Sequence, residues 1–278
     1  MHPICFNIGP FPIHWFGIML GLGFFTGLLS WMLLGKREGK DYSYCADLLF
    51  WIMVAGIVGA RLAYVISDFD YCMESPIRIF QIYRGGLIYY GGFVGAVLAA
   101  ILFARTHGER ILPFFDFIAV SIPLGHAFGR IGCFLNGCCA GIEYNGLFAV
   151  RYPGYPTDSI PWRQQFDAGL VEWNSPQSLP VVPVQLFESA FNFILYLILV
   201  WVYRNKRKDG DVTALYLLSY PIARFTFEFL RGDDRMPFLG FNLDVAQIVS
   251  IGLFVVGLAV FLWPRPLARQ YSPLNTEH

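Results

Sequence analysis

Residues 14–34 read HWFGIMLGLGFFTGLLSWMLL, a run of apolar and small residues without a single Asp, Glu, Lys or Arg. The hydrocarbon core of a bilayer is about 30 Å thick, and a helix needs about 20 mostly apolar residues to cross it. The stretch therefore predicts a transmembrane helix. Because it lacks a basic segment before it and a small-residue cleavage site, we expect a retained span rather than a cleaved signal peptide.

Further apolar stretches of similar length follow along the chain, at residues 46–66, 85–104, 112–132, 183–203, 213–230 and 243–263. Hydrophobic residues make up 56% of the 278 residues and charged residues 14%, whereas soluble domains carry about 25% charged residues. We therefore expect an all-α integral membrane protein, with about seven transmembrane helices in a single polytopic domain over residues 1–278. The net charge of zero gives no indication of nucleic-acid binding.

The connections between these spans differ in their content of Lys and Arg, which marks the cytoplasmic side. One set of connections holds eleven such residues and the opposite set holds six. The richer set comprises Lys36, Arg37, Lys40, Arg105, Arg110, Arg204, Lys206, Arg207, Lys208, Arg265 and Arg269. This predicts a cytoplasmic C-terminus and an outside N-terminus. The longest connection, residues 133–182, is then an extracytoplasmic cap, and loops of that length are usually functional.

Several ionisable residues fall inside the apolar stretches, where each charge costs about 2.5–3.5 kcal/mol on insertion scales. Given the predicted directions of the spans, most of these polar groups lie at a similar depth, in the outer half of the bilayer; only Asp116 clearly lies in the inner half. The outer group comprises His14, Arg61, Tyr90, His126, Arg130, Gln185, Glu188, Tyr220, Arg224, Glu228 and Asp244.

The spacing of these residues groups some of them on single helix faces. Tyr220, Arg224 and Glu228 follow one another at intervals of four residues, as do His126 and Arg130. A buried ion pair or hydrogen bond between helices is at least as good an interpretation for Glu188, Glu228 and Arg61 as a direct role.

Two arginines at one depth suggest a function more strongly. A guanidinium group matches the oxygens of phosphate or carboxylate, and the abundant anion of the outer leaflet is the phosphate of a phospholipid headgroup. We therefore expect Arg130 and Arg224 to line a cavity that binds or processes lipid.

The six cysteines do not suggest a metal site. Cys5, Cys45, Cys72, Cys133, Cys138 and Cys139 contain no CxxC pair, and no second thiol pair or HxxxH motif completes a zinc site. We interpret them mainly as small packing residues.

Other classes of membrane protein fit the pattern less well. A secondary transporter would be expected to show inverted repeats and polar residues through both leaflets. An intramembrane protease would need a Ser–His, paired-Asp or HExxH site, and no HExxH occurs here. A non-catalytic lipid-binding subunit stays open as an alternative, together with the transporter.

Six segments, in order, resemble the prolipoprotein diacylglyceryl transferase family. The strongest is HAFGRIGCFLNGCCAG at residues 126–141, which is similar to the signature segment of that family. The others are IHWFG (13–17), GARLAY (59–64), GGLIYYGG (85–92), PVQLFE (183–188) and YPIARFTFEFLR (220–231). The resemblance covers nearly the whole chain, and the family shares the seven-span layout with the N-terminus outside.

The resemblance implies a reaction in which a diacylglyceryl group moves from phosphatidylglycerol to the thiol of the lipobox cysteine of a preprolipoprotein. A thioether forms and glycerol phosphate is released, in the bacterial cytoplasmic (inner) membrane. The resemblance implies no metal and no organic cofactor. The nucleophilic sulfur belongs to the substrate, so no cysteine of this chain need be catalytic.

The resemblance also assigns residues. Arg130 and Arg224 match the two key arginines of the family, Asn136 and Gly141 match signature positions, and Tyr220 matches a tyrosine one turn before the second arginine. We expect catalytic roles for Arg130, Arg224, Tyr90 and His126. The expected substrate-binding residues are Arg130, Arg224, Asn136, Gly141, Tyr220, His14, Arg61, Glu228, Gln185 and Glu188.

The sequence departs from the family pattern at three positions. Tyr90 stands where many members have a histidine thought to be catalytic, Phe16 where many have tyrosine, and Cys133 where many have asparagine. Because the pKa of tyrosine is normally about 10, whereas that of histidine lies near neutrality, we hypothesise that His126 takes over or shares the role of general base.

Overall fold

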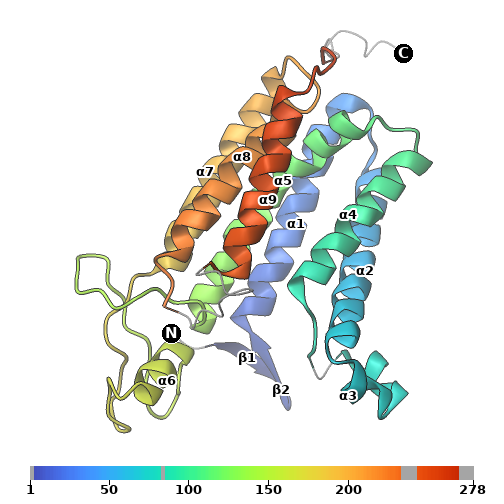
Figure 1. Cartoon of the computed structure of the whole chain (residues 1–278). Coiled ribbons are helices and arrows are strands. Elements are labelled where there is room, and N and C mark those ends of the chain that lie inside the picture. Colours follow the sequence, from blue (N-terminus) through green and yellow to red (C-terminus); the bar gives the residue numbers. More distant parts are fainter. Residues whose placement is uncertain (1–2, 83–84, 233–242, 269–278) are drawn as a thin grey trace. The chain divides into compact units, whose positions relative to one another are not determined.

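The computed structural model describes residues 3–82, 85–232 and 243–268, which are mostly helical (Figure 1). Six of the described helices are long and apolar enough to cross a membrane. They are α1 (Trp15–Gly35), α2 (Tyr42–Ser67), α4 (Tyr89–Thr106), α5 (Ile111–Asn136), α7 (Val184–Asn205) and α9 (Val245–Leu262). The expectation of an all-α integral membrane protein is confirmed.

A further long helix, α8 (Asp211–Glu228), covers the predicted sixth span. It has 18 residues, as many as α4 and α9, but these include Asp211, Arg224 and Glu228. Its composition therefore sets it apart from the six apolar helices. The expected number of seven spans depends on α8 and stays a prediction.

The helix bounds lie within four residues of the predicted spans at each end. The starts of α2 and α4 each differ by four residues from the prediction, and the difference at α4 has a clear cause. Gly85 and Gly86 adopt positive φ angles of 87° and 72°, which a helix cannot contain, so α4 begins at Tyr89 and not at residue 85. The N-terminal segment also differs, because β1 (Ile4–Ile8) and β2 (Phe11–His14) form an antiparallel hairpin. His14 is thus the last residue of a strand.

The described helices group into two compact units. The first contains residues up to 29 and those from 116 to 268, so it holds the hairpin, most of α1 and α5, and α7, α8 and α9. The second contains residues 30–115, with α2, α4, the short helices α3 (Phe69–Met73) and η1 (Lys36–Glu38), and η2 (Pro76–Phe80).

In the second unit, glycines allow α2 and α4 to approach closely. A Cβ added at Gly91 would lie 2.3 Å from the Cβ of Ala63 and 2.5 Å from the carbonyl oxygen of Gly59. A Cβ at Gly95 would lie 2.3 Å from the carbonyl oxygen of Ala55. Small residues spaced by four on both helices are typical of helix pairs packed within a bilayer. The two helices are therefore held by close backbone contact.

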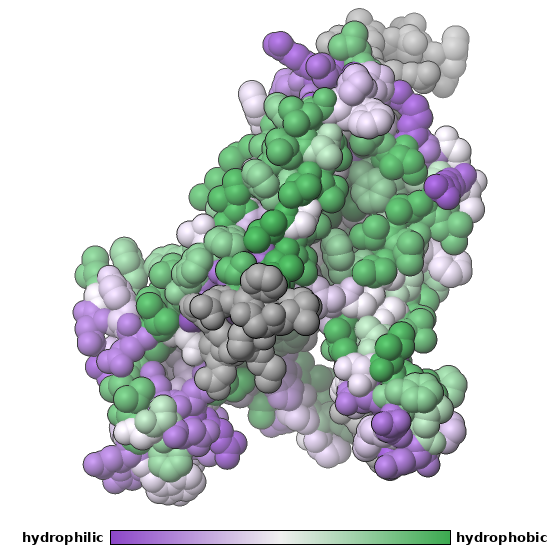
Figure 2. Space-filling model, in the orientation of Figure 1, coloured by the Kyte–Doolittle hydropathy of each residue, from purple (hydrophilic) through white to green (hydrophobic). Residues whose placement is uncertain are grey.

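The outward faces of the helices are strongly apolar, as Figure 2 shows for one side of the molecule. Phe25 of α1, Trp201 of α7 and Leu262 of α9 are each at least 64% exposed. In water this surface would be costly, at about 25 cal/mol for each Å² of apolar area. Acyl chains of the bilayer remove that cost, which agrees with a membrane location.

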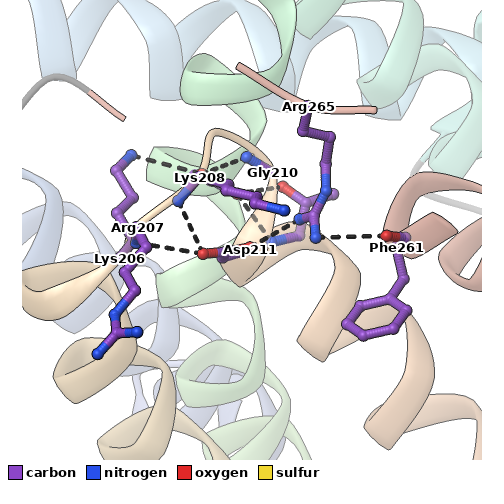
Figure 3. A network of polar contacts seen from close by, with 9 residues as sticks. Lys206, Arg207, Lys208, Gly210, Asp211, Phe261 and Arg265 are labelled. Carbon is purple, nitrogen blue, oxygen red and sulfur yellow. Dashed lines mark hydrogen bonds and ion pairs between the residues drawn. The ribbon is translucent and has the colours of Figure 1, made fainter. Parts of the chain in front are cut away.

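The turn between α7 and α8 is fixed by a polar network that includes Asp116, the residue expected in the inner half. Asp116 is fully buried in α5 and accepts hydrogen bonds from the backbone nitrogens of Gly210 (2.8 Å) and Thr213 (2.9 Å). Beside it, Arg265 donates to Asp211 over 2.8 Å (Figure 3). These contacts satisfy the buried carboxylate of Asp116, which therefore has a structural role.

The predicted cap, residues 133–182, consists mainly of irregular chain after α5 ends at Asn136. It contains one short helix, α6 (Ile160–Asp167), and isolated bridges such as Val150 to Val181. Tyr152 and Trp162 are its buried aromatic anchors, with 0% and 1% exposure. The cap thus has a small core of its own, and its extracytoplasmic location stays a prediction.

Candidate active site

Arg130, in the second half of α5, forms an ion pair through Nε with the Glu188 carboxylate of α7. Both side chains are largely enclosed, with 19% and 5% exposure. The amide of Asn192 donates to the backbone oxygen of Glu188 over 2.7 Å, and Ser189 donates to the backbone oxygen of Ala127 over 3.0 Å. Helices α5 and α7 are therefore joined by polar contacts around the arginine.

Arg224 belongs to a second charged group, on α8. Its Nη1 pairs with the Glu228 carboxylate one turn later, and Nη1 of Arg231 lies 3.6 Å from the same carboxylate oxygen. The side chain of Asp244 also hydrogen-bonds to Glu228.

Among the described residues, the guanidinium groups of Arg130, Arg224 and Arg231 pair with the carboxylates of Glu188 and Glu228. Buried charges are expensive unless they are balanced. A guanidinium group also matches the oxygens of an anionic ligand such as phosphate.

His126 connects the two groups. It lies one turn before Arg130 on α5, its ring centroid is 5.0 Å from that of Tyr220 on α8, and the charges of Arg130 and Arg224 both act on its imidazole. Its Nδ1 atom is buried without a hydrogen-bond partner among the described residues. The structure thus brings together both predicted arginines, Tyr220 and His126, although each arginine also has its own carboxylate.

The segment that follows α5 is held against α7 and the end of α8. Gln185 donates from Nε2 to the backbone oxygen of Cys138 over 2.7 Å and to the hydroxyl of Tyr152 over 3.0 Å. Burial raises the pKa of Tyr152 to about 12, so this hydroxyl stays neutral and can hold the amide. Gln185 is therefore placed as a support for the segment.

Gly141 is required where this segment meets the end of α8. Its nitrogen donates to the backbone oxygen of Val182 over 3.0 Å, and it forms a bridge with Arg231. A Cβ at this position would lie 2.5 Å from that oxygen and 2.9 Å from the backbone oxygen of Leu230. The glycine lets two chain segments meet close to the charged group on α8.

A small cavity of about 220 Å³ opens beside the C-terminus of α5. His14 and Asn136 line it, together with Asp158 and Ser159 of the cap. The Asp158 Oδ1 and Ser159 Oγ atoms are buried and have no hydrogen-bond partner among the described residues. Such atoms favour a ligand that carries hydroxyl or ammonium donors.

Two predicted site residues, Arg61 and Tyr90, belong to the second unit. Arg61 is 8% exposed, and within the described ranges it donates only to backbone oxygens, among them Ile79 (2.9 Å) and Gly85 (2.7 Å). It therefore fixes the loop that precedes α4. Tyr90 is the second residue of α4, and its ring lies 5.7 Å from that of Tyr89. Their roles in catalysis and binding stay predictions.

The sequence analysis missed a cluster of thiols at the end of α5. The sulfur atoms of Cys133, Cys138 and Cys139 all lie within 4.8 Å of one another, and this is the one group within the described ranges with donors placed to hold a metal ion. Three cysteines within seven residues were a visible signal. Their convergence depends on a turn of the backbone, which the sequence does not reveal.

Comparison with known proteins gives the family. The family model for prolipoprotein diacylglyceryl transferase matches residues 3–263. Relatives named phosphatidylglycerol–prolipoprotein diacylglyceryl transferase from Burkholderia ambifaria (strain MC40-6) and Burkholderia thailandensis (strain ATCC 700388) are each 32% identical over 277 residues, covering 94% of both chains. The match includes the helices that carry Arg130 and Arg224. The chain therefore belongs to the prolipoprotein diacylglyceryl transferase family.

Proposed function

We propose that this chain is a multi-pass enzyme of the bacterial inner membrane that transfers the diacylglyceryl group of phosphatidylglycerol to a prolipoprotein. The names of the relatives support the two substrates. The observation that carries the proposal is a pair of largely enclosed arginines, Arg130 on α5 and Arg224 on α8, each one turn beyond a ring, His126 or Tyr220, and these two ring centroids lie 5.0 Å apart. Their planar, charged groups suit the phosphate of an anionic lipid.

The two arginines act as a clamp on the lipid phosphate. Glu188 and Glu228 hold them in place before the lipid arrives, and phosphate oxygens then replace part of these ion pairs. As the bond between the glycerol carbon and the phosphate oxygen breaks, negative charge grows on the leaving group. Donors already oriented toward that oxygen stabilise the transition state more strongly than they stabilise the bound lipid before reaction.

The acceptor in this scheme is the lipobox cysteine of the prolipoprotein. Its sulfur attacks the glycerol carbon that carries the phosphate, the carbon–oxygen bond breaks, and glycerol phosphate leaves with the bonding electrons. His126 accepts the thiol proton, because its Nδ1 lacks a partner among the described residues and the residue lies one turn before Arg130 on α5. Tyr90 is the alternative base.

The cavity beside Asn136 suits the headgroup of phosphatidylglycerol, which ends in a glycerol with two hydroxyl groups. Asp158 and Ser159 present unpaired polar atoms there, and Asn136 lies six residues beyond Arg130 on α5, about 9 Å along the helix axis. In the predicted orientation, with the N-terminus outside, this end of α5 and the cap face the extracytoplasmic side.

The direct test uses detergent-purified protein, phosphatidylglycerol and a peptide that contains a lipobox cysteine. We expect a mass gain of one diacylglyceryl group on the peptide and release of glycerol phosphate. A peptide with serine in place of the cysteine should stay unmodified. Lipid binding without transfer would instead support a non-catalytic lipid-binding subunit, and movement of a solute across vesicles without transfer would support a transporter.

A further inference from the structure

The turn that follows α5 is a helix-ending motif in which both closing positions are cysteines. Helix α5 ends at Asn136, and Gly137 follows with a φ of 72°. The Gly137 nitrogen donates to the backbone oxygen of Phe134 over 3.3 Å. The Cys138 nitrogen donates to the backbone oxygen of Cys133 over 3.1 Å. Two such hydrogen bonds around a left-handed glycine define the Schellman motif, and the side chains of its outer pair, here Cys133 and Cys138, commonly pack together.

The thiols of this outer pair lie close enough to bond after rotation of the side chains. Cys138 Sγ is 3.6 Å from the backbone oxygen of Cys133, so the Cys138 side chain turns back toward the helix. The sulfur atoms of Cys133, Cys138 and Cys139 all lie within 4.8 Å of one another, whereas a disulfide bond is about 2.05 Å long. A bridge between the adjacent residues Cys138 and Cys139 would be strained. Because Cys133 and Cys138 are already joined through their backbones, they are the favoured pair.

Cys133 also lies on the side of α5 that carries the proposed catalytic groups. His126, Arg130 and Cys133 occur at positions i, i+4 and i+7, which share one face of a helix. The cysteine is half-buried, so its thiol is not sealed inside the protein core. In the proposed function, the lipobox cysteine brings a second thiol to this face. Under oxidising conditions the two sulfurs would form a mixed disulfide, which would trap the substrate on the enzyme.

We propose that Cys133 and Cys138 are joined by a disulfide in the working enzyme, and that this bridge prevents Cys133 from bonding to the substrate thiol. In the predicted orientation this end of α5 faces the extracytoplasmic side, where disulfides form and persist. Cys139 stays a thiol, and the bridge takes no part in the transfer reaction. This inference rests on the proposed function for the identity of the thiol substrate.

The bridge forms by exchange with an external disulfide, such as that of a thiol–disulfide oxidoreductase. One thiolate of the pair attacks a sulfur of the oxidant, and a mixed disulfide forms as the sulfur–sulfur bond of the oxidant breaks. The second thiolate then attacks the enzyme sulfur of that mixed disulfide. The bond between Cys133 and Cys138 forms, and the oxidant leaves as a dithiol that carries the two electrons and the two protons.

The first measurement maps the disulfide in full-length protein expressed in bacterial cells. The cells are quenched in acid, free thiols are alkylated under denaturing conditions, and the peptides are analysed by mass spectrometry before and after reduction. We expect Cys133 and Cys138 to become alkylated only after reduction, and Cys139 before it. Three free thiols in the turn, a metal ion held by them, or a bridge that includes Cys139 would each overturn the proposal.

The second measurement uses matched variants to test whether the bridge protects the substrate thiol. Cys138→Ser with Cys139→Ser leaves Cys133 as the one thiol of the turn, and a triple variant with Cys133→Ser as well removes it. Each purified protein receives reduced lipobox peptide together with an excess of the disulfide dimer of that peptide. We expect the double variant to gain the mass of one peptide at Cys133 and to lose transfer activity at least about tenfold, with recovery in dithiothreitol.

The controls distinguish protection from folding. Wild-type protein and the triple variant should keep their transfer activity and gain no peptide in the turn. Equal transfer by the double and triple variants before dithiothreitol is added would overturn the protective role, as would a peptide attached to wild-type protein at Cys139. The mapping of the wild-type disulfide does not depend on whether either variant folds.

The two proposals fail in different ways. Transfer by protein whose three thiols are all free in cells would refute the disulfide and leave the transferase assignment intact. A mapped bridge between Cys133 and Cys138, in protein that transfers a diacylglyceryl group to no lipobox peptide, would support the disulfide and refute the proposed function.

Discussion

The buried arginines of the two units are held in different ways. Arg61, in the second unit, donates to the backbone oxygens of Ile79, Gly85 and Gly86 over 2.7–2.9 Å. Arg130, in the first unit, is paired with the side-chain carboxylate of Glu188. Backbone oxygens cannot leave without unfolding the loop, whereas a carboxylate can rotate away when a phosphate arrives. We therefore expect the second arrangement, and not the first, to leave an arginine available for an anionic lipid.

The largest effect should come from Arg130→Lys. Lysine keeps the charge but loses the planar group that holds two phosphate oxygens, so we expect kcat/KM for diacylglyceryl transfer to fall about 100- to 1,000-fold with the fold retained. Arg61→Lys is the matched comparison, and it should lower thermal stability with little loss of activity per folded molecule. Full activity of purified Arg130→Lys would remove the clamp from the mechanism.

The next largest effect should come from His126→Ala. We expect kcat to fall about 100-fold at neutral pH because a positioned base is lost. Activity should recover as the pH rises, since hydroxide can then remove the thiol proton. Initial rates across a pH series, compared with Tyr90→Phe, distinguish the two candidate bases. If the His126→Ala protein turns over as fast as the wild type, His126 is not the general base.

Glu188→Gln tests whether phosphate replaces the carboxylate. Removing one partner of a buried ion pair leaves the other charge unbalanced and costs about 3–5 kcal/mol. We expect the lipid-free variant to melt at a lower temperature and to gain more from phosphatidylglycerol than the wild type does. Phosphatidylethanolamine, which has no net charge, is the control lipid. An equal gain for both proteins would mean that the lipid phosphate does not take the place of Glu188.

Asp158→Asn should have a smaller effect, restricted to substrate affinity. Losing a charged acceptor for a headgroup hydroxyl costs about 1 kcal/mol, so KM for phosphatidylglycerol should rise about fivefold with kcat unchanged. The exposed residue Asp167 offers a control substitution in the same cap. An unchanged KM would show that this cavity does not bind the lipid headgroup.

The smallest effect on catalysis should come from Gly91→Ala, because it acts on the second unit through packing. The new methyl group would lie 2.3 Å from Ala63, so stability should fall by about 1–3 kcal/mol. Gly21→Ala on α1, where nothing lies within 4 Å, is the control and should not lose stability. Unfolding in mixed micelles measures both. Equal stability of the two variants would contradict the close contact between α2 and α4.

The sequence predicted the helices well because a membrane span is defined by the length of an apolar run, which can be counted. It also predicted the pairing of His126 with Arg130 on one face, since spacing along a helix fixes direction. It could not predict that Gly85 and Gly86 turn away from α4, because glycine permits positive φ without requiring it. The same limit hid the cysteine cluster, whose geometry depends on the turn at Gly137 and Cys139.

Helix α8 has a consequence for how the chain is assembled in the bilayer. Its 18 residues include Asp211, Arg224 and Glu228, while α9, which packs against it, carries no charge at all. We expect α8 to enter lipid only together with α7 and α9, whose side chains shield its ionic groups. A nascent chain that stops before α9 should therefore leave α8 outside the hydrocarbon, so we expect the proposed arginine clamp to form only after the last helix has been synthesised.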